Sequence, residues 1–268
     1  MKATLLRGRD HTVMGAVAGA DDGPVALALS RGGAPKPYPH TEPNEDAALC
    51  ARGENGLLVA VADGHWGHRA AELALGHLLA EVANEWTEGK ARGAASWRQA
   101  ALAALAGANG AVLSARTPEQ RSRTTLALAL ARPLENLLVC GSMGDSHLFR
   151  VGDDGVLELA VMRGSRAVFL GERLSPAALA REARVEVQSL EPCVALVAAT
   201  DGLSEESIGV ADPAAAVREA VALARGRETG TRAAAAAHAL VEAALAAHRK
   251  NQAGDNIAAA VAWLRREG

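Results

Sequence analysis

The chain has 268 residues and a hydrophobic share of 49%, enough to bury the core of a single domain spanning residues 1–268. The net charge is −3 and no basic run interleaves with aromatic residues, which excludes nucleic acid as an expected partner. The longest uncharged run, 99–115, carries Gln, Asn and two Gly, so it is not expected to span a membrane. The cysteines Cys50, Cys140 and Cys193 lie apart in apolar runs, as free thiols of a reducing compartment do, so we expect a cytoplasmic protein. We also expect a monomer.

The first half of the chain predicts three strands and then two helices. Gly, Pro and Asn bound the short apolar runs Val25–Ser30, Ala47–Ala51 and Leu57–Ala62, which is typical of strands. Apolar residues recur at three- and four-residue spacing in Gly67–Trp86, which indicates a helix with one buried stripe. A second helix follows, with Ser96 as its expected N-cap and with Gly107 and Gly110 marking a close backbone contact or its frayed end.

The second half continues with a meander of strands and closes with two helices and a strand. Ser175-Pro176 and Asp212-Pro213 each pair a capping residue with a proline suited to the first helical position. His248 ends the apolar stripe of the last helix and is expected to be a core or surface residue. The expected strands are Thr124–Ala131, Asn136–Gly141, His147–Val151, Val156–Val161, Val185–Ser189, Val194–Ala199 and Ile257–Leu264, and the expected helices are 176–183, one beginning at Pro213, and Thr231–His248.

Helices therefore arrive in pairs between groups of hairpin-linked strands. A parallel sheet would alternate single helices with single strands, so this order does not favour one. It favours an α+β fold in which two antiparallel sheets form a sandwich and an antiparallel pair of helices flanks each side.

Carboxylates gather in short turns next to the strand-like runs. Several acids converging at strand ends would repel one another by about 4 kcal/mol per pair at ~4 Å and an effective dielectric near 20, and bound cations would remove that cost. Ligand sets made only of oxygen atoms suit Mg²⁺ or Mn²⁺. The chain is therefore expected to be a metal-dependent hydrolase. The turns are Asn44-Glu45-Asp46, Asp63-Gly64-His65, Gly144-Asp145-Ser146, Asp201-Gly202-Leu203 and Gly254-Asp255-Asn256.

Two cations in such a site need one bridging carboxylate. Asp63 is the best candidate, because Gly64 beside it has no side chain and its carbonyl can also approach a metal. Glu45 and Asp46 would complete the shell of one ion, and Asp201 and Asp255 that of the other. Asp145 could hold a third, weaker ion together with Asp201.

Taken in order, the turns resemble the motifs of the metal-dependent protein serine/threonine phosphatase family, type 2C. The resemblance runs from about residue 44 to the C-terminus. The matching segments are Asn-Glu-Asp-Ala (44–47), Ala-Asp-Gly-His-Trp-Gly-His-Arg-Ala-Ala (62–71), Arg-Thr-Thr-Leu (123–126), Met-Gly-Asp-Ser (143–146), Ala-Thr-Asp-Gly-Leu (199–203) and Gly-Asp-Asn-Ile (254–257).

The resemblance implies a phosphatase that acts on phosphoserine and phosphothreonine in proteins. Two Mn²⁺ or Mg²⁺ ions would share Asp63 and the Gly64 carbonyl, and a water or hydroxide bridging them would attack the phosphorus in line. Glu45 and Asp46 would be direct or water-mediated ligands, His65 would protonate the departing oxygen, and Asp201 and Asp255 would ligate the other ion. The substrates would be targets of a bacterial serine/threonine kinase.

The chain departs from the family pattern near the expected substrate phosphate. Thr41 stands where an arginine usually clamps the phosphate, Trp66 and Arg123 each replace a glycine, and the segment between Asp145 and Asp201 lacks a Thr-Asp-His turn, so a reduced flap is expected. Candidates to replace the clamp are Arg123, Arg163 and Arg166, followed by Arg173, Lys36 and His40.

Two other functions stay open at this point. The Asp63-x-His65 and Gly144-Asp145 segments faintly resemble calcineurin-like metallophosphoesterases, but a Gly-Asn-His turn and downstream histidine ligands are missing. A pseudophosphatase that binds phosphoproteins with weak or no turnover would explain the missing clamp arginine. The intact set of carboxylates argues against it.

Overall fold

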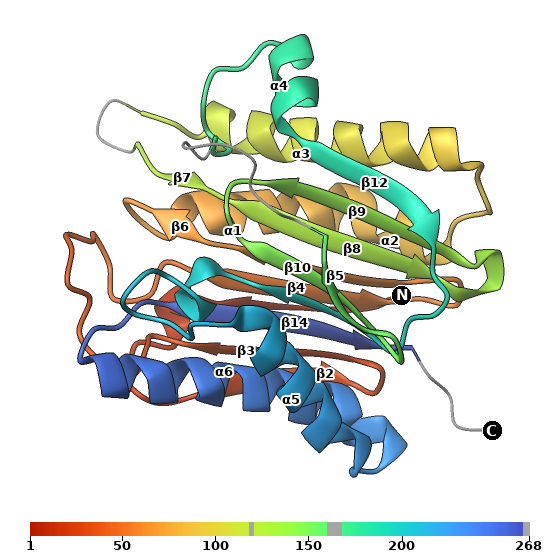
Figure 1. Ribbon diagram of the computed structural model, residues 1–268. Coiled ribbons are helices and arrows are strands. Elements are labelled where there is room, and N and C mark those ends of the chain that lie inside the picture. The colour runs from red at the N-terminus through yellow and green to blue at the C-terminus, as the bar shows by residue number, and fades with distance from the viewer. Residues whose placement is uncertain (118–120, 160–167, 265–268) are drawn as a thin grey trace.

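Two antiparallel sheets stacked face to face form the centre of the computed structural model, which describes residues 1–117, 121–159 and 168–264 (Figure 1). Within these residues each sheet has six strands. The first sheet has the order β1 (Lys2–Arg7), β4 (Ala47–Arg52), β5 (Leu57–Ala62), β8 (Leu126–Arg132), β9 (Leu137–Met143) and β12 (Arg184–Ser189). The second has the order β11 (Gly155–Glu158), β10 (His147–Gly152), β13 (Ala195–Ala199), β14 (Ile257–Trp263), β3 (Val25–Ser30) and β2 (Ala18–Asp22). The two-residue strands β6 (Gly64–His65) and β7 (Arg123–Thr124) pair separately.

The central strands are apolar throughout because both of their faces are buried. On β5, Val59 and Val61 belong to the core between the two sheets, whereas Leu58 and Ala60 pack toward the helices outside the first sheet. Alternate side chains of one strand thus enter two different cores, which is why these strands read as continuous hydrophobic runs.

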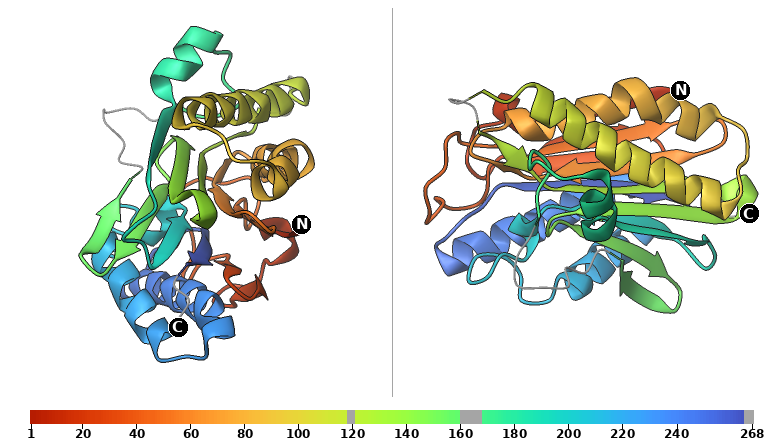
Figure 2. Two further views of the ribbon diagram at one scale, coloured as in Figure 1. Left: turned by 90° about the vertical axis from the view of Figure 1, so that its right-hand side faces the viewer. Right: turned by 90° about the horizontal axis from the view of Figure 1, so that it is seen from above.

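A layer of helices covers the outer face of each sheet (Figure 2). The first layer holds α1 (Arg69–His77), the π-helical segment η2 (Leu78–Val82), α2 (Ala83–Glu88) and α3 (Ala94–Ser114); the second holds α5 (Pro213–Arg225) and α6 (Arg232–Asn251). The short 3-10 helices are η1 (Gly8–Asp10), η3 (Pro133–Glu135), η4 (Asp201–Leu203) and η5 (Thr229–Thr231). This arrangement confirms the predicted α+β sandwich with helices on both sides. Among the described helices, none combines the length and the apolar character that crossing a bilayer requires.

Gly107 lets the two helices of the first layer approach closely. A Cβ atom at this position would lie 2.2 Å from Nε2 of His77 at the end of α1. A Cβ at Gly110, one turn further along α3, would meet no atom within 4 Å. Gly107 is therefore at the helix contact that the sequence suggested, and α3 continues past both glycines to Ser114.

The structure differs from the sequence prediction at the edges of elements. The strands Lys2–Arg7 and Ala18–Asp22 were not predicted; both are sheet edges with exposed or half-buried residues, so they lack the apolar signal of a buried strand. Ser96 is not the N-cap of α3, because the helix begins at Ala94 and its N-cap is Gly93. Ser175 is a cap as predicted: its side chain accepts a hydrogen bond from the amide of Ala178 at the start of α4 (Pro176–Glu182).

The segment between β11 and β12 contains α4 but is described only in part. The strand predicted over Val156–Val161 is present as β11 up to Glu158, and residues 160–167 lie outside the described residues. The reduced flap expected here therefore stays a prediction.

Candidate metal centre

Three carboxylates from three separate turns meet where strands of both sheets end. Asp63 follows β5 and Asp145 follows β9 in the first sheet, whereas Asp201 follows β13 in the second. One carboxylate oxygen from each of the three residues lies within 4.8 Å of the others. The sandwich therefore brings together acids that are 138 residues apart along the chain (201 − 63), as the sequence predicted.

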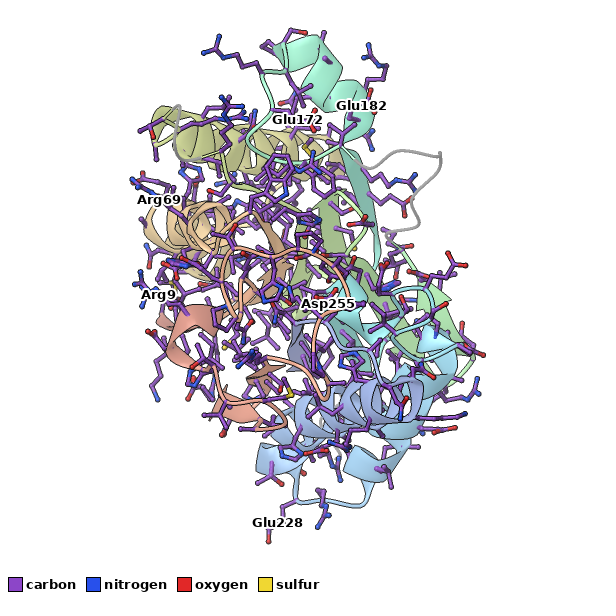
Figure 3. The ribbon with its side chains drawn as sticks, turned by 90° about the vertical axis from the view of Figure 1, so that its left-hand side faces the viewer. Arg9, Arg69, Glu172, Glu182, Glu228 and Asp255 are labelled. Carbon is purple, nitrogen blue, oxygen red and sulfur yellow. The ribbon has the colours of Figure 1, made fainter. Side chains whose placement is uncertain are left out.

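Asp46 and Asp255 are close enough for their charges to act on Asp63 and Asp201, which gives a cluster of five aspartates. Thr200 donates a hydrogen bond from Oγ1 to Oδ2 of the buried Asp46 over 2.7 Å. Oδ1 of Asp255 accepts a hydrogen bond from the amide of Asn256 over 2.7 Å and pairs with Nζ of Lys36 at 3.1 Å. In Figure 3 Asp255 lies between the two helical layers.

The charges of the cluster oppose one another strongly. Burial first, and then the charges of neighbouring aspartates, raise the pKa values of Asp63 and Asp201 well above the usual range. The same causes raise the pKa of Asp46 to about 7. In addition, Oδ1 of Asp145 is buried and has no hydrogen-bond partner among the described residues. A group of buried oxygen ligands with excess negative charge and an unpaired acceptor fits divalent cations such as Mg²⁺ or Mn²⁺.

Backbone hydrogen bonds fix Asp63 at the centre of this group. Its carbonyl accepts from the amide of Thr125 over 3.0 Å and from Oγ1 of Thr124 over 2.7 Å. Its own amide donates to Oγ1 of Thr125 over 2.9 Å, and that hydroxyl is 2.7 Å from Oγ of Ser146. The Arg-Thr-Thr-Leu and Gly-Asp-Ser segments therefore hold the position of the Asp63 backbone.

Glu45 lies beside the cluster, and its carboxylate accepts hydrogen bonds from the backbone of the surrounding loops. The backbone amides of Thr41, Glu42 and Gly67 donate hydrogen bonds to Oε1 of Glu45 over 2.9–3.1 Å. Glu45 is outside the close group formed by Asp63, Asp145 and Asp201. A Cβ atom at Gly64 would lie 2.3 Å from the carbonyl oxygen of Glu45, so only glycine fits between this turn and Asp63.

His65 lies at the edge of the cluster. Its Nδ1 atom is 3.7 Å from Oδ2 of Asp63 and has no hydrogen-bond partner among the described residues. Its ring packs against Phe169 with ring centroids 4.6 Å apart. Burial, and also the nearby charge of Arg123, lower the pKa of His65, while the charge of Asp145 acts in the opposite direction.

Arg123 lies next to His65 because the two residues are paired across β6 and β7. Its guanidinium carbon is 4.2 Å from the ring centroid of Phe169 and 5.2 Å from that of Trp66. Trp66 is 58% exposed and has a φ of 61°, in the left-handed region. Of the four arginines proposed to bind phosphate, Arg123 borders the cluster and Arg173 lines a different pocket together with Arg116 and Arg121. Arg163 and Arg166 lie outside the described residues.

His248 of α6 supports the turn that carries Asp201. Its Nδ1 atom accepts a hydrogen bond from the amide of Gly33 over 3.2 Å, so its Nε2 atom donates to the carbonyl of Gly202 over 2.7 Å. His248 is fully buried, which confirms it as a core residue. No sequence pattern predicts its hydrogen bonds to the turns at Gly33 and Gly202, because the partners are backbone groups remote in sequence.

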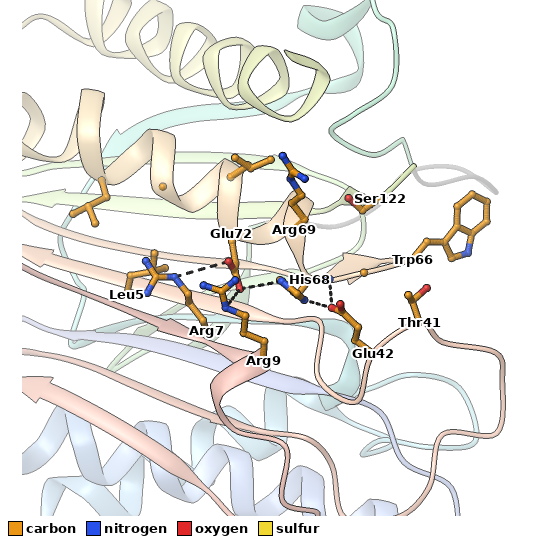
Figure 4. Close-up of a pocket in the computed structure, with 14 residues that line it drawn as sticks. Leu5, Arg7, Arg9, Thr41, Glu42, Trp66, His68, Arg69, Glu72 and Ser122 are labelled. Carbon is orange, nitrogen blue, oxygen red and sulfur yellow. Dashed lines mark hydrogen bonds and ion pairs between the residues drawn. The ribbon is translucent and has the colours of Figure 1, made fainter. Parts of the chain in front are cut away.

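A charged groove of about 590 Å³ lies between the 41–42 segment and α1 (Figure 4). Its lining includes Thr41, Glu42 and Gly67, whose amides bind Glu45. Glu72 pairs with Nε of Arg9 at 3.1 Å and with Nε of Arg7 at 4.0 Å. Nε2 of His68 is 3.8 Å from Glu72, and its Nδ1 atom contacts Glu42. His68 is therefore partly buried in this ion-pair network and is not the exposed helix residue that the sequence suggested.

Comparisons with known proteins agree with this geometry. The family model described as protein phosphatase 2C matches residues 38–243. The chain is similar to the Mycobacterium tuberculosis serine/threonine phosphatase PstP/Ppp, with 21% identity, a TM-score of 0.63 and coverage of 93% of this chain and 99% of that one. It is also similar to a structure of the PstP catalytic domain in complex with two manganese ions, with 19% identity, a TM-score of 0.62 and coverage of 92% of this chain and 99% of that one. For the serine-threonine phosphatase 2C from Toxoplasma gondii the identity is 18%, the TM-score is 0.65, and the coverage is 98% of this chain and 99% of that one. The search among curated proteins found no match.

Proposed function

Because the chain belongs to the protein phosphatase 2C family of metal-dependent serine/threonine phosphatases, we propose that it hydrolyses phosphoserine and phosphothreonine in proteins at the aspartate cluster. The observation that carries this proposal is the meeting of Asp63, Asp145 and Asp201 within 4.8 Å at the end of the sandwich. Substrates phosphorylated by a bacterial serine/threonine kinase fit this activity.

Two divalent ions, Mn²⁺ or Mg²⁺, would bind to the cluster. Asp63, at its centre, would be shared by both ions together with the Gly64 carbonyl. Asp201 and Asp255 would ligate one ion and Asp46 the other. Glu45 would contact its ion through water, because its Oε1 atom already accepts three backbone hydrogen bonds. Asp145 and Asp201 would hold a third, weaker ion. When bound, such ions lower the pKa of water and neutralise charge on the transferring phosphoryl group.

His65 would supply the proton that the leaving oxygen of serine or threonine needs. An alkoxide is a poor leaving group, and a positioned acid typically contributes about 10²–10⁴ in rate. The geometry of His65 suits this role, because its Nδ1 atom has no hydrogen-bond partner among the described residues and its ring is held by Phe169 at the edge of the cluster. Burial lowers the pKa of His65, so its acid form would rely on nearby negative charge such as that of Asp145.

Arg123 would bind the substrate phosphate. Thr41, at the position of the usual clamp, has no charge, and its amide is used by Glu45. The Arg123 guanidinium group lies beside His65, and its stacking on Phe169 limits the side-chain entropy lost on binding. A guanidinium group can donate two parallel hydrogen bonds to one phosphate.

Hydrolysis of p-nitrophenyl phosphate and of a phosphothreonine peptide in millimolar Mn²⁺ tests the proposal. We expect turnover by the wild type, its loss with EDTA, and a fall of about a hundredfold or more in Asp201→Asn, because metal ions supply several kcal/mol of transition-state stabilisation. Asp153→Asn is the matched control, since Asp153 lies in the exposed β10–β11 hairpin and pairs with Arg225.

Two outcomes would contradict the proposal. Turnover that survives both EDTA and Asp201→Asn would place the chemistry elsewhere. No turnover by the wild type would favour the pseudophosphatase, for which the neutral Thr41 is the motivating observation.

A further inference from the structure

Lys36 places a positive charge inside the aspartate cluster. Its Nζ atom is 3.1 Å from Oδ1 of Asp255, and the two side chains are only 8% and 9% exposed. Lysine is seldom buried unless it is paired, so this position requires an explanation.

The loop that carries Lys36 is fixed against the turn that carries Asp255. Lys36 lies between Pro35 and Pro37, whose rings restrict the backbone. The carbonyl of Pro35 accepts a hydrogen bond from the amide of Gly254 over 2.9 Å. A Cβ atom at Gly254 would lie 1.9 Å from the carbonyl oxygen of Ala34, so the two segments touch backbone to backbone. The lysine is therefore directed at Asp255 by its surroundings and is not a surface side chain that happened to fold inward.

The contact leaves little room for a metal ion on the same oxygen. Oδ1 of Asp255 already accepts from the amide of Asn256 and from Lys36. A divalent ion on Oδ1 would have to displace the ammonium group, and an ion on the other oxygen would lie close to a like charge. In both cases Lys36 opposes binding of the ion.

We propose that Lys36 is an internal competitor for one metal site: it neutralises Asp255 in the metal-free protein and must leave that carboxylate when a divalent ion binds. This inference rests on the proposed function only in assigning Asp255 as a metal ligand. The consequence is a metal affinity that is weaker at one site than the carboxylates alone would give, and a metal-free state that is kept folded by an ion pair.

Calorimetric titration of the full chain with Mn²⁺ tests this. Lys36→Met keeps the length of the side chain and removes its charge, so we expect one Mn²⁺ ion to bind about tenfold or more tightly than in the wild type. Lys36→Arg keeps the charge and should stay within about threefold of the wild type. Lys90→Met, an exposed lysine between α2 and α3, controls for the change in net charge.

Thermal unfolding supplies a second readout that does not depend on activity. In EDTA, Lys36→Met should unfold at a lower temperature than the wild type, because its cluster lacks a counter-ion; in saturating Mn²⁺ the difference should vanish or reverse. An equal loss in both conditions would indicate a packing role and would overturn the inference.

The two proposals can fail separately. If the wild type binds Mn²⁺ and Lys36→Met binds it equally or more weakly, the competition is disproved while the metal centre stands. If the wild type binds no Mn²⁺, both are disproved.

Discussion

Arg123 lies against two aromatic rings, those of Phe169 and Trp66, beside His65, and is the residue proposed to bind the substrate phosphate. Its Nε atom is buried and has no hydrogen-bond partner among the described residues, and Glu172 approaches the guanidinium group only to 3.8 Å. A bound phosphate would therefore compete with this long ion pair between Nη1 and Glu172, because the buried Nε atom is closed to a ligand. The same stacking shields the group from water, which strengthens its interaction with an anion.

Replacing Arg123 tests this role directly. Arg123→Met keeps the contact with Phe169 and removes the charge, so kcat/KM for the phosphothreonine peptide should fall about 10- to 100-fold, in line with ~1.5–3 kcal/mol for a charged hydrogen bond. Most of the change should be in KM. Arg181→Met, at an exposed position of α4, is the control. An unchanged KM with an intact Mn²⁺ affinity would exclude Arg123 as the phosphate ligand.

At the scale of elements, periodicity located the buried strands and the long helices because burial repeats along them. Leu57–Ala62 was predicted with its observed bounds, since all six residues are buried between a sheet and a helix layer. The strand Ala18–Asp22 was missed because it contains Gly and two Asp and pairs on one side only. For such an edge strand, the partner decides the conformation more than local preference does.

The helix α3 offers a comparison of two interior glycines. Glycine in the middle of a helix costs about 0.5–1 kcal/mol relative to alanine. Gly110→Ala meets open space and should therefore stabilise the protein by roughly that amount. In Gly107→Ala the new methyl group would meet the His77 ring, so the gain should be cancelled or reversed.

Urea unfolding of both variants, and of each in a His77→Ala background, measures the contact. The penalty at Gly107 should disappear when His77 is shortened, whereas Gly110→Ala should behave alike in both backgrounds. Equal stabilisation by the two alanines would mean that α1 and α3 do not touch at Gly107.

On the scale of the whole molecule, the sequence predicted which turns carry the acidic residues. It did not predict which side chains from other loops contact the site. The motifs identified Asp63, Asp145 and Asp201, because each follows a strand and strand ends gather at one edge of a sandwich. The pairing of Lys36 with Asp255 and the stacking of Arg123 on Phe169 depend on how loops remote in sequence pack. No local pattern carries that information.

The aspartate cluster also joins the two sheets, and this leads to a prediction about stability. Asp63 and Asp145 follow strands of the first sheet, whereas Asp201 follows a strand of the second and Asp255 precedes another. Without cations, burial and then the charges of the neighbouring aspartates oppose ionisation, and these two causes raise the pKa values of Asp63 and Asp201. Divalent ions would turn that repulsion into attraction in the folded state only, because the unfolded chain keeps these residues apart.

Mn²⁺ at a hundredfold excess over its dissociation constant should therefore add about 2.7 kcal/mol and raise Tm by about 5–10 °C. In Asp201→Asn the metal-free protein should be no less stable than the wild type, because one of the repelling charges is gone, whereas the rise in Tm on adding Mn²⁺ should be much smaller. Scanning calorimetry with and without EDTA measures both quantities. Two results would show that the cluster does not hold the two layers together through bound cations. One is a wild-type Tm that does not change when Mn²⁺ is added, and the other is an equally large rise of Tm in Asp201→Asn and in the wild type.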